Sequence, residues 1–199
     1  MKNFIGAFAV LLSIALTGEA AGRGKLYGAV VVIDPGHGGK DPGSHGLFTG
    51  DEVWEDEYAY DVALRVRDFI KKEDGVAFLT IEDPNGKVPR DWVPSKVFPP
   101  DHDEVFSLDR TQVRARTAGL SRRLQYANSI KRRYPKHRVV FVAIHFDVVG
   151  KRTDVAGVQI IAARQDSALA HALVESFHER MRQERPLEVI GEGARNLYI

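Results

Sequence analysis

Residues 29–39 read AVVVIDPGHGG, an apolar run that ends in a glycine-rich turn. A run of β-branched residues without polar interruption is typical of a strand that is buried on both of its faces. Residues 76–81 and 139–146 have the same character, and residues 155–163 form a fourth run of this kind. These four stretches predict the strands of a buried sheet.

Stretches with helical periodicity lie between the apolar runs. Apolar side chains recur at spacings of three and four within residues 55–72, 114–133 and 166–184, as they do on the buried face of a helix. Strands that alternate with helices of this length favour a sheet covered on both faces. We therefore expect an α/β fold, a single domain with a mostly parallel or mixed sheet sandwiched between helices.

A proline-rich insert at residues 83–109 breaks this alternation and holds five of the nine prolines. A stretch of that length without secondary structure is usually either functional or disordered. Apolar side chains within the insert could pack against the domain, namely those of Trp92, Val93, Val97 and Phe98. We therefore expect an ordered flap beside the functional site or across its mouth, with a plain surface loop as the alternative.

Composition excludes several classes of protein. The 199 residues are 44% hydrophobic and 28% charged, with 28 Lys and Arg against 27 Asp and Glu. A net charge of +1 gives no reason to expect nucleic acid as a partner. The absence of cysteine from the sequence excludes disulfide scaffolds and thiolate metal sites. A metal ion would have to be held by histidines and carboxylates.

The first 20 residues have the pattern of a secretory signal. Lys2 precedes an apolar run over residues 4–16, and Gly18 and Ala20 occupy positions −3 and −1 of a plausible cleavage site. We expect a signal peptide at residues 1–20, a linker at 21–28 and the folded domain at 29–199. The mature chain would be exported to the periplasm or cell envelope and have no membrane span, whereas an uncleaved N-terminal anchor is the alternative.

Three side chains stand out as candidate metal ligands. His37 lies in the middle of the glycine-rich turn, and His145 lies at the end of the third apolar run. Glu55 shares the apolar stripe of its helix, where a buried carboxylate needs a cationic partner. Asp56 and Glu57 fall off that stripe and are expected to serve only the helix dipole.

Topology predicts that these candidates meet. Ligands of open α/β sheets gather beyond the carboxyl ends of the strands, where His37 and His145 are both expected. Two histidines, one carboxylate and an open fourth position are the usual ligands of a hydrolytic zinc site. Asp34 and Asp147 flank the histidines and are candidates for orienting them, and His45 is a candidate for contacting substrate.

Three runs together resemble the zinc-dependent N-acetylmuramoyl-L-alanine amidases of the type-3 family. They are IDPGHGGKDPG at residues 33–43, WEDEYAYDVALRV at 54–66 and AIHFD at 143–147, and RLQYAN at 123–128 is also similar. The resemblance extends over residues 29–199. The resemblance implies an enzyme of cell-wall remodelling. Such an enzyme binds peptidoglycan and hydrolyses the amide between N-acetylmuramic acid and L-alanine. The resemblance makes His37, Glu55 and His145 the zinc ligands and leaves any activator protein open.

The resemblance also implies a catalytic glutamate that acts as general base near the end of a C-terminal strand. Residues 196–199 resemble the beginning of the strand before that position, and neither Glu188 nor Glu192 matches it. The expected position of the base therefore lies beyond Ile199. On this reading the 199-residue form is truncated, poorly active and marginally stable.

Two other functions are compatible with the same motifs. A non-catalytic zinc-dependent domain could bind peptidoglycan without cutting it, as the missing base would allow. Another zinc hydrolase, such as a carboxypeptidase acting on the stem peptide, could use the same ligands. Release of new lactyl carboxyl groups from peptidoglycan distinguishes the amidase from both.

Overall fold

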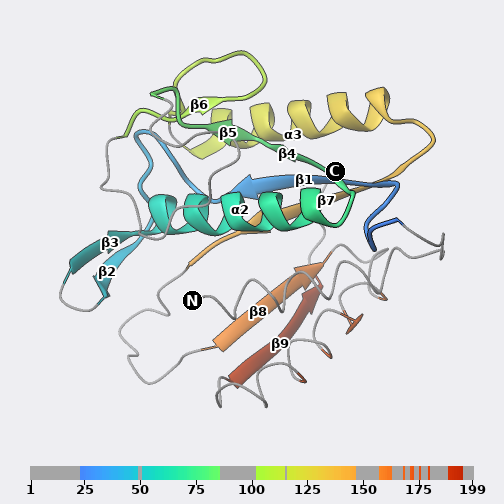
Figure 1. The fold of residues 1–199 in the computed structure, drawn as a ribbon. Helices are drawn as coiled ribbons and strands as arrows, with labels where there is room; N and C mark the ends of the chain where they lie inside the picture. Colours follow the sequence, from blue (N-terminus) through green and yellow to red (C-terminus); the bar gives the residue numbers. More distant parts are fainter. Residues whose placement is uncertain are drawn as a thin grey trace. The chain divides into compact units, whose positions relative to one another are not determined.

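The computed structural model describes residues 23–48, 51–85, 102–114, 116–146, 157–162 and 188–194, and five single positions between 168 and 179 (Figure 1). The described residues fall into two compact units, of which the larger is Tyr27–Val148 and the smaller contains β8 (Gly157–Ala162) and β9 (Glu188–Ala194). The predicted signal peptide lies outside the described residues. Within them, no helix combines the length and the apolar character that crossing a membrane requires.

The larger unit is built on a parallel sheet of strand order β4–β1–β7. Its strands are β1 (Ala29–Pro35), β4 (Val76–Leu79) and β7 (Arg138–Ile144), so the three strands expected here are confirmed. Every residue of the central strand β1 is buried. β4 and β7 contain partly exposed residues, so the expectation that they are buried like β1 was wrong. Each has only β1 as a neighbour within this described sheet.

Two helices cover opposite faces of the sheet (Figure 1). The bounds of α2 (Glu55–Lys72) coincide with those expected, and α3 (Arg116–Arg133) begins two residues later than expected. Val30 and Val32 pack against Ala127 and Ile130 of α3, and the alternate residues of β1 point to the other face. The expected α/β fold, with a parallel sheet flanked by helices, is confirmed.

The strand order reverses at β1, and this places a site. From β1 the chain passes through α2 to β4 on one side, and then through α3 to β7 on the other side of β1. Ligands of α/β sheets bind beyond the carboxyl ends of the strands at such a reversal. His37 follows β1 and His145 follows β7, so both histidines lie at this end of the sheet.

Two small antiparallel pairs were not expected from the sequence. β2 (His45–Phe48) pairs with β3 (Asp51–Trp54), directly before α2. β5 (Ile81–Glu82) pairs with β6 (Val105–Phe106) and joins the two ends of the proline-rich insert. Residues 86–101 of the insert lie outside the described residues, so the flap stays a prediction.

In the smaller unit, β8 and β9 form a parallel pair with a shift of register between Val158 and Gln159. β8 confirms the strand expected at residues 155–163. β9 was missed because its sequence, EVIGEGA, contains two glycines and no long apolar run. Glu192 lies within β9 opposite Ile160, and residues 196–199 are outside the described part of the chain.

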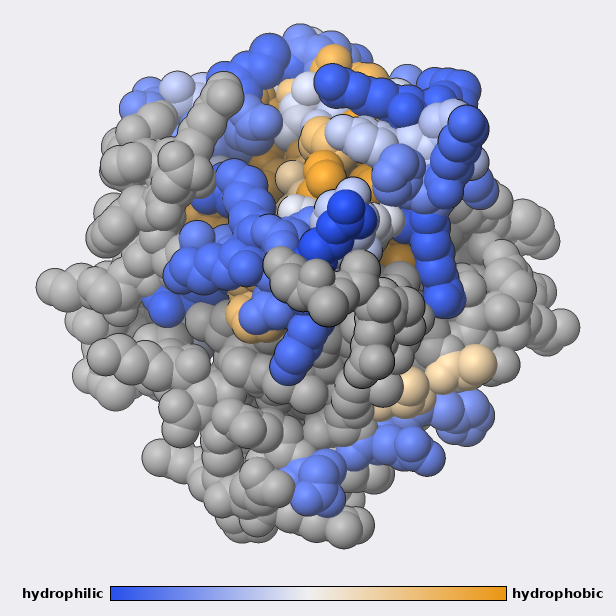
Figure 2. All heavy atoms as spheres, turned by 45° about the vertical axis from the view of Figure 1, so that its right-hand side comes forward, coloured by the Kyte–Doolittle hydropathy of each residue, from blue (hydrophilic) through white to orange (hydrophobic). Residues whose placement is uncertain are grey.

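The described residues expose few large apolar side chains. On the face drawn in Figure 2, hydrophilic side chains surround a small area of apolar ones. The large apolar side chains that the described residues expose are those of Tyr27, Val76 and Leu120. Isolated apolar side chains of this kind are ordinary on a folded protein.

Shortening a side chain of β1 tests how much the buried strand contributes to stability. Ile33 is fully buried, whereas Leu120 on α3 is 66% exposed. We expect Ile33→Ala to lower the free energy of unfolding by about 2–5 kcal/mol, because it leaves a cavity in a close-packed core. Leu120→Ala is the matched control and should have little effect. Urea unfolding measures both, and equal destabilisation by the two substitutions would contradict the packing described.

Candidate metal site

The turn after β1 gives His37 its position. The amide of Gly36 donates to the carbonyl of Ile144 at 2.7 Å and so ties the turn to β7. A Cβ on Gly36 would lie 2.5 Å from Nδ1 of His145, which is too close for any side chain. The next residues, His37, Gly38 and Gly39, have positive φ angles of 64°, 117° and 60°. Glycine adopts such angles without strain, whereas they are uncommon for a histidine. The glycines therefore let the backbone turn sharply while His37 faces His145.

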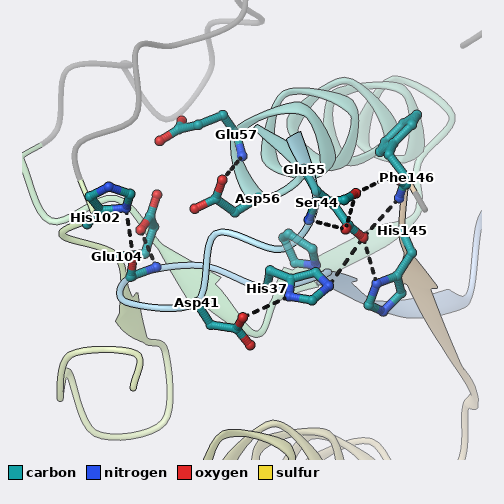
Figure 3. A network of polar contacts seen from close by, with 12 residues as sticks. His37, Asp41, Ser44, Glu55, Asp56, Glu57, His102, Glu104, His145 and Phe146 are labelled. Atoms are coloured by element: carbon teal, nitrogen blue, oxygen red, sulfur yellow. Dashed lines mark hydrogen bonds and ion pairs between the residues drawn. The ribbon is translucent and has the colours of Figure 1, made fainter. Parts of the chain in front are cut away.

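Three side chains from separate elements converge at this turn (Figure 3). Nε2 of His37 lies 3.3 Å from Oε1 of Glu55, and Nδ1 of His145 lies 3.1 Å from the same oxygen. The two imidazole rings are nearly perpendicular, with centroids 5.3 Å apart. The potential ligand atoms of the three residues all lie within 4.8 Å of one another, an arrangement that could hold a metal ion. The structure thus brings together the three ligands expected from the sequence.

Glu55 is fixed by groups that the sequence analysis did not identify. Its Oε2 accepts hydrogen bonds from the amide and hydroxyl of Ser44, at 3.0 and 2.9 Å, and its Oε1 accepts one from the amide of Phe146 at 3.1 Å. Burial alone would raise the pKa of Glu55, but hydrogen bonds with His145, His37, Ser44 and Phe146 hold it far below its ordinary value. Glu55 is therefore a carboxylate that stays charged inside the protein.

His37 has a second acidic neighbour. Asp41 Oδ1 lies 3.3 Å from Nδ1 of His37, so one carboxylate faces each ring nitrogen. The hydrogen bond with Glu55 raises the pKa of His37, against the effect of desolvation, and Asp41 raises it further. Asp41 is placed to orient the ring, as partners beyond the ligands usually do. The sequence shows that His37 and Asp41 are four residues apart, but only the geometry of the turn brings their side chains together.

Among the described residues, Asp34 is connected to the turn through Arg123. It accepts hydrogen bonds from Thr80 and from the guanidinium of Arg123, and all three residues are buried. Arg123 also donates to the carbonyls of Pro35 and His37. The pair therefore holds the backbone of the turn rather than a histidine ring. Arg123 was not predicted as a site residue, although it begins the run RLQYAN that carries part of the resemblance.

The other expected site residues lie elsewhere or outside the described chain. His45 stacks on Trp54 with ring centroids 4.7 Å apart and is not in the convergent group, so its contact with substrate stays a prediction. Asp147 lies outside the described residues, and its orienting role also stays a prediction.

The expectation that Asp56 and Glu57 would lie off the buried face of α2 was wrong. Both are buried, with Glu104 beside them. The cause is tertiary: the glycine-rich turn and the end of the insert cover the first turn of α2, as the hydrogen bond from the Asp56 amide to the Pro42 carbonyl indicates. Burial raises the pKa of Asp56 to about 6, and the charge of Glu104 contributes to this rise.

Comparison with known proteins gives three similarities. The family described as N-acetylmuramoyl-L-alanine amidase matches residues 31–199. The germination-specific N-acetylmuramoyl-L-alanine amidase of Bacillus subtilis (strain 168) is 35% identical over 57 residues, which are 29% of this chain and 22% of that enzyme. The match thus spans about a fifth of that relative. The N-acetylmuramoyl-L-alanine amidase AmiC2 of Nostoc punctiforme has a similar fold, with a TM-score of 0.50 and 22% identity over 87% of this chain and 72% of its own.

Removing the guanidinium of Arg123 tests the support of the turn. Arg123→Met keeps much of the side-chain volume but leaves the buried carboxylate of Asp34 without its cation. We expect the free energy of unfolding to fall by about 3–5 kcal/mol, the usual effect of breaking a buried pair. Arg122→Met is the neighbouring control, since Arg122 pairs with Asp109 at the surface and surface pairs contribute about 0–1 kcal/mol. Equal losses would show that Asp34 does not depend on Arg123.

The pH dependence of chelator-treated protein tests the pairing of Glu55 with His37. The pKa of His37 is raised from 6.5, so its stabilising effect is complete below pH 6.5 and is lost as pH rises through the higher folded value. The pKa of Glu55 is lowered from 4.5, so its effect is complete above pH 4.5 and is lost only in strong acid. The wild type should therefore exceed His37→Asn in stability most clearly between these two pH values. Urea unfolding from pH 4 to pH 9 measures the difference, and a difference that grows above pH 7 would contradict the pairing.

Proposed function

Because the chain belongs to the N-acetylmuramoyl-L-alanine amidase family, we propose that it hydrolyses the amide bond between N-acetylmuramic acid and L-alanine in peptidoglycan. The cofactor in this proposal is one zinc ion held by His37, Glu55 and His145. The observation that carries the proposal is the convergence of these three side chains beyond the ends of β1 and β7. The alternative of a non-catalytic binding domain is not favoured, because the family is one of hydrolases.

The donor atoms suit zinc. Two imidazole nitrogens and one carboxylate oxygen are a common protein ligand set for catalytic zinc, with bonds of about 2.0–2.2 Å. Two ligand atoms on a tetrahedral zinc ion are then about 3.3 Å apart. The separations of 3.3 and 3.1 Å between Glu55 Oε1 and the two imidazole nitrogens support this assignment. Imidazole nitrogen is among the ligands that suit zinc.

The residues around the ligands have separate tasks in this proposal. Ser44 holds Oε2 of Glu55 and leaves Oε1 facing the two histidines. Asp41 Oδ1 lies 3.3 Å from Nδ1 of His37 and favours the proton on that nitrogen, which leaves Nε2 able to bind a metal. A bound zinc ion would polarise the amide carbonyl and lower the pKa of water enough for attack near neutral pH.

Access to the site is uneven. The side chain of His145 is 46% exposed and that of His37 is 22% exposed, whereas that of Glu55 is only 1% exposed. Substrate would therefore approach over the histidines, with Glu55 at the closed side. We propose that the chain acts outside the cytoplasm, after removal of residues 1–20, with the domain at residues 29–199 and the insert near the mouth of the site. Peptidoglycan is the only partner that the proposal requires.

Alanine variants of the three ligands test the proposal. We expect His37→Ala, Glu55→Ala and His145→Ala to lose bound zinc, and acidification below about pH 6 to release it from the wild type as imidazoles become protonated. Elemental analysis of purified protein measures the zinc. His137→Ala is the control, because His137 is an exposed histidine that packs against Tyr134 away from the ligands.

The reaction is followed by digesting purified peptidoglycan and measuring new N-terminal L-alanine. The wild type and His137→Ala should release it, and chelation should abolish the release until zinc is restored. Full zinc occupancy in all three ligand variants would contradict the metal site. Release of terminal amino acids from the stem peptide, with the muramoyl amide intact, would instead identify a zinc peptidase.

A further inference from the structure

A second group of acidic side chains lies beside the histidine site. Asp56, Glu57 and Glu104 each offer a carboxylate oxygen, and these oxygens all lie within 4.8 Å of one another. The three residues are 1%, 3% and 3% exposed. Like charges repel at such distances, and burial strengthens the repulsion. A group of this kind needs a positive charge among its oxygens.

Asp56 is the least satisfied member of the group. Its Oδ1 accepts a hydrogen bond from the amide of Glu57 at 2.9 Å. Its Oδ2 is buried and has no hydrogen-bond partner in the described structure. Within that part of the chain, neither Asp56 nor Glu104 forms an ion pair with lysine or arginine. A buried carboxylate oxygen without a partner is rare in proteins unless an ion or a water molecule binds there.

The acidic group joins three segments that are distant in the sequence. Asp56 and Glu57 belong to the first turn of α2, and Glu104 follows the part of the insert outside the described residues. Glu104 Oε2 accepts from the amide of Gly39 in the glycine-rich turn. Figure 3 shows the group on one side of this turn, with His37, Glu55 and His145 on the other.

We propose that Asp56, Glu57 and Glu104 form a second metal site, which binds a calcium ion through carboxylate oxygens. The donors are all oxygens, which hard cations prefer over zinc. Two oxygens on one ion can be separated by at most twice the bond length, about 4.6–5.2 Å for calcium but only about 4.0–4.2 Å for magnesium. The three carboxylate oxygens all lie within 4.8 Å of one another, so one calcium ion can contact all of them.

The role of this ion is structural. Its two positive charges offset most of the negative charge of the three buried carboxylates, and it fastens the end of the insert to α2 and to the turn that carries His37. Backbone contacts already connect the same segments: Gly39 donates to Glu104, and the Gly39 carbonyl lies 3.1 Å from Nδ1 of His102. The ion would complete this junction. Its donors include none of the three ligands of the histidine site.

Calcium titration of the zinc-loaded full chain tests the second site. Isothermal titration should find one calcium ion per chain, and calcium should raise the midpoint of thermal unfolding. Asp56→Asn and Glu104→Gln should weaken calcium binding at least tenfold and abolish the shift in midpoint. Asp68→Asn should bind like the wild type, because Asp68 lies on the same helix but pairs with Lys72 at the surface. Glu57→Gln replaces Asp56→Asn if the latter does not give a folded circular dichroism spectrum.

Three results would overturn the proposal. The first is no binding by the wild type at about 10 mM calcium, above the range of weak protein calcium sites. The second is loss of calcium binding in His37→Ala but not in Asp56→Asn, which would locate the ion at the histidine site. Magnesium is titrated in parallel, and tighter binding of magnesium than of calcium would also contradict the assignment.

Discussion

The carboxylate of Glu55 lies inside the protein, where an ion without partners would be strongly destabilising. Two imidazoles face its Oε1, and Ser44 and the Phe146 amide complete its hydrogen bonds. These partners come from the turn after β1, the loop before β2 and the end of β7. The site therefore depends on one buried charge that holds three separate segments together. A metal ion would replace the protons and hydrogen bonds that the histidines share with this carboxylate.

Arg123 supports the same arrangement from the opposite side of the turn. It reaches from α3 to Asp34 at the end of β1 and to the carbonyls of Pro35 and His37. A planar guanidinium can make several hydrogen bonds in fixed directions, so one side chain fixes both the strand end and the turn. α3 thus contributes to the position of His37 without contributing a ligand. The acidic group of Asp56, Glu57 and Glu104 adds a third attachment, where the insert returns to the turn.

Much of the fold could be predicted from local sequence. β1 is central and wholly buried, so it contains no polar residue before Asp34, and its pattern was unambiguous. α2 begins with three acidic residues and ends with two lysines, which mark both of its ends through the helix dipole. β9 was not predicted, because its two glycines interrupt the apolar pattern of a strand. It forms all the same, because it pairs with β8. Local propensity is a weak guide where strand pairing supplies the stability.

The sequence by itself determined the three candidate ligands, because histidines after buried strands and a carboxylate on an apolar helix face can be read one residue at a time. It also determined the α/β architecture, because the spacing of apolar residues along the chain distinguishes helices from strands. Only the tertiary structure decided which groups hold those ligands. Ser44, Asp41 and Arg123 act through contacts whose partners depend on turn geometry and strand order. Asp56 and Glu57 are buried because distant segments cover them, and no periodicity within α2 could indicate that.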